Sequence, residues 1–192
     1  MVETLSAERC ALLDHVQAAW PASAIVAEQW EHGPIRVNVP GFEVIRVMPA
    51  DTAQSIAYVT SGCFTIEATE HLRHEFFLLA PTEDRRHVEI LAMLANFHAD
   101  RRYRLDLGSV VAIGEPWLPR STCDHLLICL PYTHGPKFEW LRLPGCCVRF
   151  LWALPITTDE ASFGKENGLE ALEQKFEALQ FDYWNPYRTS VV

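Results

Sequence analysis

Hydrophobic and polar residues alternate most clearly between residues 56 and 81, and this stretch sets the expected architecture. Two β-rich runs, Ile56–Ser61 and Leu72–Ala80, flank a polar segment that contains Gly62. Side chains alternate between two faces along the second run, whose first half is polar and whose second half is apolar on both faces. Pro81 then ends the run, because proline lacks the N–H that a sheet ladder needs. These residues predict two strands of a sheet that is covered on both sides.

Further strands are expected before and after this stretch. Runs rich in β-branched and aromatic residues occur at 42–48, 107–112, 124–131, 138–143 and 147–155. Short links rich in glycine and proline separate the last three runs, which predicts an antiparallel meander. A shorter strand is expected at 35–39, inside a turn-rich segment that covers 22–40.

Helical spacing of apolar residues predicts helices at 6–20 and 85–100 and two more near the end of the chain. Ser6 is the expected cap of the first helix and Asn167 the expected cap of the last. Thr157 with Glu160 forms a capping box, which predicts a short helix that ends near Gly164. The pattern therefore predicts one α+β domain over residues 1–192, with helices covering one mixed, largely antiparallel sheet.

Charge and hydropathy limit the classes of partner. The 192-residue chain has 16 Lys and Arg against 25 Asp and Glu, a formal net charge of −9. This charge disfavours nucleic acid and anionic membranes and would attract a basic partner, although acidity also occurs merely for solubility. No apolar run is long enough to cross a bilayer, and the first residues lack the basic start of a secretory signal. We therefore expect a cytoplasmic protein that binds neither nucleic acid nor membrane.

Residues that could carry chemistry do not form a recognised catalytic motif. The run from His71 to Glu75 contains two histidines, but residues three apart on a strand point to opposite faces and cannot share one metal. The six cysteines contain no C-x-x-C pair, so a zinc ribbon is not expected either. We therefore expect no catalytic residue, cofactor or metal. The alternative is a small-molecule-binding or metal-dependent enzyme with a pocket lined by His74, Glu75, His98 and Asp124.

Several short motifs resemble those of the Suppressor of fused family and follow one another in that family's order. They include Tyr58-Val59-Thr60-Ser61-Gly62, Leu78-Leu79-Ala80-Pro81, Leu94-Ala95-Asn96-Phe97, Leu107-Gly108-Ser109-Val110-Val111, Leu126-Leu127-Ile128-Cys129-Leu130-Pro131 and the closing Arg188-Thr189-Ser190-Val191-Val192. The resemblance is clearest over residues 40–192. The order of the motifs is more specific than any one of them.

The resemblance implies a non-enzymatic protein-binding domain. Animal members have a second domain and hold a transcription-factor peptide partly as an added β-strand. Bacterial single-domain members include immunity proteins of polymorphic toxin systems. Since this chain has no room for the second animal domain, the resemblance implies an immunity protein that binds a cognate toxin, for example a basic nuclease attracted by its acidic surface. A regulatory partner unrelated to toxins is the other interaction hypothesis.

Five residues are candidate contacts for this partner. The resemblance supplies Phe97, which replaces a tyrosine of animal members, and Ser109, which replaces an acidic residue. The missing carboxylate argues against the ligand that animal members bind, and Phe97 also fits plain packing on its helix. Glu115, Trp117 and Asp124 complete the set, as acids and an aromatic expected to be exposed near a proline-rich loop.

Overall fold

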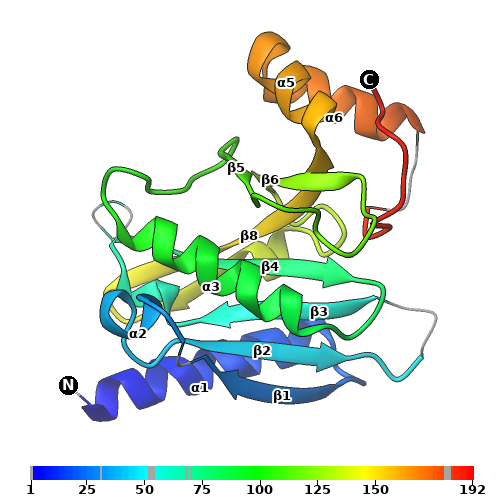
Figure 1. Cartoon of the computed structure of the whole chain (residues 1–192). Helices are drawn as coiled ribbons and strands as arrows, with labels where there is room; N and C mark the ends of the chain where they lie inside the picture. Colours follow the sequence, from blue (N-terminus) through cyan, green and yellow to red (C-terminus); the bar gives the residue numbers. More distant parts are fainter. Residues whose placement is uncertain (1, 31, 52–54, 68, 70, 180–182) are drawn as a thin grey trace. The chain divides into compact units, whose positions relative to one another are not determined.

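The structure is a computed structural model that describes residues 2–30, 32–51, 55–67, 69, 71–179 and 183–192. These residues form six α-helices and an eight-stranded mixed sheet (Figure 1). The strand order is β1-β2-β3-β4-β8-β6-β5, and β7 pairs with β8 off this path. The predicted α+β class with a mixed sheet is therefore confirmed.

Two compact units make up the chain. The first contains Met1–Leu105 and Leu130–Trp152, and the second contains Asp106–Cys129 and Ala153–Val192. Strand β8 (Cys146–Thr157) belongs to both units, because the division falls within it. The units are described separately below.

Four antiparallel strands begin the first unit: β1 (Ala24–Gln29), β2 (Glu43–Met48), β3 (Ile56–Ser61) and β4 (Leu72–Ala80). Strand β4 is parallel to β8, which also pairs in antiparallel fashion with β7 (Trp140–Leu143). Strand β3 is buried along its whole length, as its β-branched and aromatic composition predicts. The bounds of β3 and β4 match those expected from the sequence.

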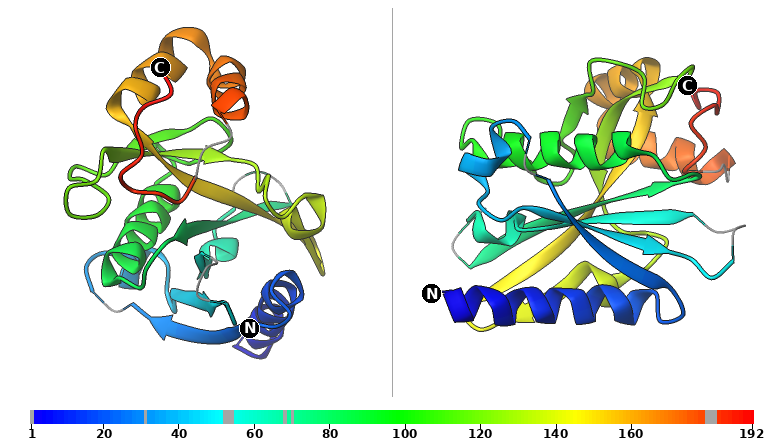
Figure 2. Two further views of the ribbon diagram at one scale, coloured as in Figure 1. Left: turned by 90° about the vertical axis from the view of Figure 1, so that its right-hand side faces the viewer. Right: turned by 60° about the horizontal axis from the view of Figure 1, so that its bottom comes forward.

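Helices cover both faces of these strands. Figure 2 shows α1 (Val2–Ala19) and α3 (Arg85–Ala99) on opposite sides of the sheet. Fully buried leucines supply the inner face of each helix, including Leu12 on α1 and Leu91 on α3. Asp84 caps α3 by accepting a hydrogen bond from the backbone N of Arg86 at 2.8 Å.

Several local expectations for this unit are wrong. The turn-rich segment contains strand β1, and the strand expected at 35–39 is helix α2 (Ile35–Asn38). Helix α1 begins at Val2, so Ser6 is not its cap. The strand expected at 138–143 begins only at Trp140, because α4 (Pro136–Glu139) precedes it with proline in its first turn. The predicted meander is also incomplete, since in the described residues β7 lies off the main strand path and pairs with β8 but not with β6.

The second unit contains β5 (Val110–Ala112), β6 (Cys123–Cys129), α5 (Thr158–Asn167) and α6 (Leu169–Leu179). The predicted capping box is confirmed: Thr157 accepts from the backbone N of Glu160, and Glu160 accepts from the backbone N of Thr157. Helix α5 continues beyond Gly164 to Asn167 and is followed by Gly168, whose φ of 91° is a backbone conformation that favours glycine. Asn167 is therefore the last residue of α5 and does not cap α6.

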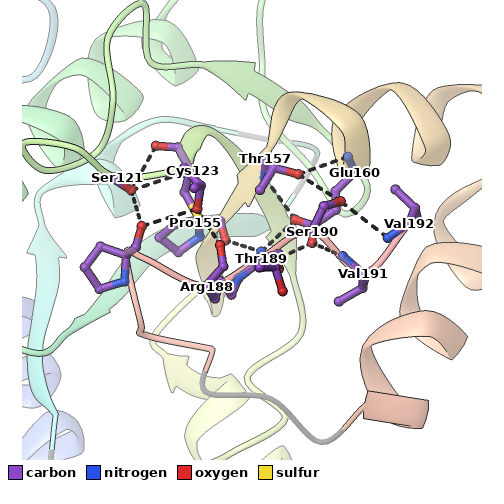
Figure 3. A network of polar contacts seen from close by, with 12 residues as sticks. Ser121, Cys123, Pro155, Thr157, Glu160, Arg188, Thr189, Ser190, Val191 and Val192 are labelled. Atoms are coloured by element: carbon purple, nitrogen blue, oxygen red, sulfur yellow. Dashed lines mark hydrogen bonds and ion pairs between the residues drawn. The ribbon is translucent and has the colours of Figure 1, made fainter.

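The end of the chain is bound to the second unit by a polar network (Figure 3). The side chain of Arg188 is buried and donates to Glu160 Oε2 at 2.6 Å and to the carbonyl of Pro155 at 3.0 Å. Farther along the chain, the backbone N of Val191 donates to Glu160 Oε1 at 3.1 Å. Hydroxyl groups just before β6 complete the network, since Ser121 Oγ donates to the carbonyl of Pro186 at 2.6 Å.

Candidate functional site: a groove beside strand β5

Strand β5 ends the strand order, and among the residues that the structure describes no strand pairs with its outer edge. A bulge introduces it, in which Gly108 and Ser109 together face Ile128. The backbone N of Gly108 donates to the carbonyl of Ile128, and the N of Ile128 donates to the carbonyl of Ser109, both at 2.8 Å. Gly108 has a φ of 80°, which glycine adopts readily in this type of bulge. Such bulges redirect a strand where its pairing begins.

The free edge presents backbone hydrogen-bonding groups of Val110 and Ala112. In the β5–β6 ladder, Ile128 bonds to Ser109, and Ile113 donates to the carbonyl of Asp124 at 2.9 Å. Antiparallel ladders use alternate residues, so the groups of the intervening residues point away from β6. The side chain of Val110 is 41% exposed. This short edge is therefore open to an added strand.

A groove of about 460 Å³ follows one face of this strand. Alternate residues of the β5 segment form one wall, and helix α5 forms the other. The lining residues are Gly108, Val110, Ala112, His125, Thr158, Ala161, Ser162, Gly164 and Lys165. Glycine and alanine supply much of this lining, so small side chains leave the space beside the open edge.

The polar groups of the groove come from β6 and α5. Asp124 accepts a hydrogen bond from Thr158 Oγ1 at 2.6 Å, and its Oδ1 lies 2.8 Å from Nδ1 of His125. Partial burial acts to raise the pKa of Asp124, but the hydrogen bonds from Thr158 and His125 outweigh it, and the pKa is lowered. Asp124 is therefore ionised and held by its neighbours, while His125 and Lys165 line the groove itself.

The structure places the other sequence candidates differently. Ser109 lies at the bulge and is half-buried, with its Oγ accepting from the backbone N of Asp106 at 3.0 Å. Glu115 is exposed on the following loop, whereas Trp117 is 0% exposed. The expectation of an exposed Trp117 is wrong, because its large apolar surface is placed in the core. In the first unit, Phe97 is half-buried with its ring centroid 6.1 Å from that of Tyr103, which fits the packing alternative.

Sequence reasoning missed the groove residues of β5 and α5. Val110, Ala112 and Lys165 belong to no chemical motif, and their grouping depends on the packing of a helix against strands distant in sequence. One signal was present: glycines at 108 and 114 flank a short apolar run, which is typical of a short strand between turns.

The alternative enzyme site is not assembled as expected. His74 and Glu75 are consecutive on β4 and point to opposite faces. Glu75 accepts from the backbone N of Gly62 at 2.9 Å and of Phe64 at 3.0 Å, and also from the hydroxyl of Thr60. Burial raises its pKa to about 7, although these hydrogen bonds act in the opposite direction. Its carboxylate therefore accepts hydrogen bonds from groups of the protein itself.

His98 instead lies beside His74, with 5.4 Å between their ring centroids. The backbone N of Leu105 donates to Nδ1 of His98 at 3.2 Å, and burial lowers the pKa of His98 to about 3. Across the residues that the structure describes, no three His, Cys, Asp or Glu side chains gather in a way that could hold a metal ion. The side chains of His74, Glu75 and His98 therefore do not converge on one site as the alternative hypothesis requires.

Comparisons with known proteins agree with this fold. The family described as "Suppressor of fused protein (SUFU)" matches residues 39–189. A solved Suppressor of fused homologue from Neisseria gonorrhoeae is 35% identical, with a TM-score of 0.85 and 96% of each chain covered. The Sufu–Fu complex structure is 12% identical with a TM-score of 0.70, covering 95% of this chain and 91% of the other. Drosophila Suppressor of Fused is also 12% identical, with a TM-score of 0.69, covering 94% of this chain and 50% of the other. No curated protein matches.

Proposed function

Because the chain belongs to the Suppressor of fused family, we propose that it is a non-enzymatic domain that binds an extended segment of a protein partner along strand β5. The observation that carries this proposal is that β5 has an open edge and, along one of its faces, a groove that helix α5 also lines. Suppressor of fused domains are protein-interaction domains, and one has been solved in a Sufu–Fu complex. A partner segment would join the sheet by β-augmentation.

The groove geometry suggests how the segment is held. Its backbone would exchange hydrogen bonds with the outward groups of Val110 and Ala112, and alternate side chains would enter the space beside α5. Glycine and alanine in the lining favour apolar side chains of moderate size. The hydroxyl of Ser162 and the ammonium of Lys165 offer polar contacts at the helix wall.

The partner that we propose is a cognate bacterial toxin, which the chain neutralises in the cytoplasm of the producing cell. The Neisseria homologue, which covers the chain along almost its whole length, supports the bacterial rather than the two-domain animal role. The formal net charge of −9 would speed encounter with a basic toxin such as a nuclease. No helix in the described part of the chain combines the length and apolar character that a membrane crossing requires.

The sequence candidates have separate roles in this proposal. Ser109 and Asp124 lie close to the groove residues in sequence, and Glu115 is exposed on the loop after β5. We propose that these three contribute to the rim of the interface, while Trp117 supports the loop from the core. Phe97 lies in the other unit and would be an independent contact.

Coexpression with a candidate toxin tests the proposal. The wild-type chain should restore growth and bind the purified toxin in calorimetry. Ala112→Pro removes an outward N–H of β5 and should weaken binding at least about tenfold. The matched control is Ala27→Pro, at an exposed alanine of β1, which should bind like wild type. Continued killing at matched expression would contradict the toxin partner, and full binding by Ala112→Pro would contradict the β5 site.

A further inference from the structure

Strand β1 ends the strand order on the side of the first unit and lacks the usual protection of an edge strand. All six of its residues pair with β2 in one continuous register without a bulge. Its sequence, AIVAEQ, contains no proline, lysine or arginine. The side chain of Val26 is 46% exposed. Edge strands commonly carry several charges, prolines or bulges that prevent another strand from pairing, whereas Glu28 is the only charged residue of β1, so this open edge invites strand addition.

The ladder with β2 determines which backbone groups face outward. The N of Trp30 donates to the carbonyl of Phe42 at 3.5 Å, one step beyond the Gln29–Glu43 pair. Because hydrogen-bonded pairs alternate in antiparallel sheets, every second residue back from Trp30 bonds to β2. The N–H and C=O groups of Ile25, Ala27 and Gln29 therefore point to the free edge.

We propose that this edge pairs with β1 of a second copy of the chain, in antiparallel fashion about a twofold axis at Ala27. A twofold axis perpendicular to the sheet keeps residues of the same face opposite each other. Centring it on Ala27 places Ile25 opposite Gln29 and Val26 opposite Glu28. All three outward-facing residues of each chain then take part, giving roughly six hydrogen bonds between the copies. The small side chain of Ala27 meets only its own symmetry mate.

Neighbouring registers fit less well. Centring the axis on Val26 leaves Gln29 without a partner residue in β1 of the second copy. The number of hydrogen bonds between the copies then falls to roughly four. Centring it on Glu28 places two carboxylates directly opposite each other, which is destabilising. The axis at Ala27 avoids both defects, so the strand is self-complementary in one register.

The expected association is weak and depends on concentration. Two edges of five paired residues bury less than the ~1,000 Å² that a stable interface normally needs. Sedimentation velocity from micromolar to millimolar chain should show a reversible monomer–dimer equilibrium. This inference is independent of partner binding at β5, because it concerns a different edge of the sheet.

Two variants test the use of this edge. Ala27→Pro removes an outward N–H from each copy without removing a donor to β2, and should weaken the dimer at least about tenfold. Ala112→Pro is the matched control on β5 and should dimerise like wild type. Circular dichroism of both variants shows whether the fold is retained. A wild-type chain that stays monomeric, or a dimer unaffected by Ala27→Pro, would overturn the proposal.

A charge pair at Val26 tests the register itself. Val26→Lys would face Glu28 of the second copy and should leave the dimer intact or tighten it, with a gain that added salt removes. Val26→Glu would face the same carboxylate and should weaken the dimer several-fold. An equal loss of dimer affinity in both variants would contradict the proposed register. If the β1 amides became protected from hydrogen exchange only when a different protein was added, the proposal that a second copy pairs with this edge would be wrong.

Discussion

The guanidinium of Arg188 and the carboxylate of Glu160 form a buried ion pair, with 2.6 Å between Nη2 and Oε2. The same carboxylate accepts from the backbone N of Thr157 at 2.9 Å and of Val191 at 3.1 Å. One side chain therefore joins the start of α5 to the end of the chain (Figure 3). Because α5 forms a wall of the groove, this ion pair also supports the candidate binding site.

Breaking this ion pair should destabilise the protein strongly. Arg188→Met leaves the carboxylate of Glu160 buried without its cation, which typically costs about 3–5 kcal/mol of unfolding free energy. Urea unfolding followed by circular dichroism measures the change. Arg101→Met, at an exposed arginine, is the control and should change stability by less than about 0.5 kcal/mol. Equal stability of the two variants would contradict the structural role of Arg188.

Glu75 should make the folded state less stable as the pH rises from about 4.5 to about 7. Its pKa in the folded protein is raised to about 7, so the folded state keeps a proton that the unfolded chain releases in this range. The full effect is roughly 3 kcal/mol. Glu75→Gln mimics the protonated form and should remove this downward contribution, so that the unfolding free energy measured in urea rises more with pH across the range than it does in the wild type. The exposed Glu166→Gln should keep it, and an unchanged slope in Glu75→Gln would contradict the account.

Two buried histidines act in the opposite direction. Burial lowers the pKa of His87 to about 4 and that of His98 to about 3. The unfolded chain therefore binds protons that the folded protein excludes, and stability is lost as the pH falls from about 6.5. In NMR titrations, the ring signals of both residues should stay unchanged down to about pH 5. A midpoint near 6 for either ring would contradict their burial.

Filling the groove should block the partner without unfolding the chain. Ser162 is exposed on α5 and lines the groove, so Ser162→Trp would occupy the space beside β5. We expect at least about a tenfold loss of affinity for the proposed toxin partner in calorimetry. The control is Glu166→Trp, on the same helix but outside the lining. Equal affinities of both variants would place the interface elsewhere.

Local signals predicted much of the fold. The runs Ile56–Ser61 and Leu72–Ala80 have the expected bounds because their composition and the following Pro81 act within a few residues. The capping box at Thr157 was equally clear, since its two hydrogen bonds join residues three apart.

Features that depend on distant contacts were not predictable in the same way. Ala24–Gln29 is rich in alanine and becomes a strand because β2 pairs with it. Trp117 lies on a proline-rich loop, which suggested exposure, yet the core takes up its side chain. The groove combines β5 residues with α5 residues about fifty positions later, and no local motif marks that combination.

Amide hydrogen exchange of the chain with and without the proposed toxin partner tests the central claim most directly. The account predicts that the amides of Val110 and Ala112, which point away from β6, become protected in the complex. A complex of full affinity in which these two amides exchange as fast as in the free chain would contradict binding by strand addition at β5.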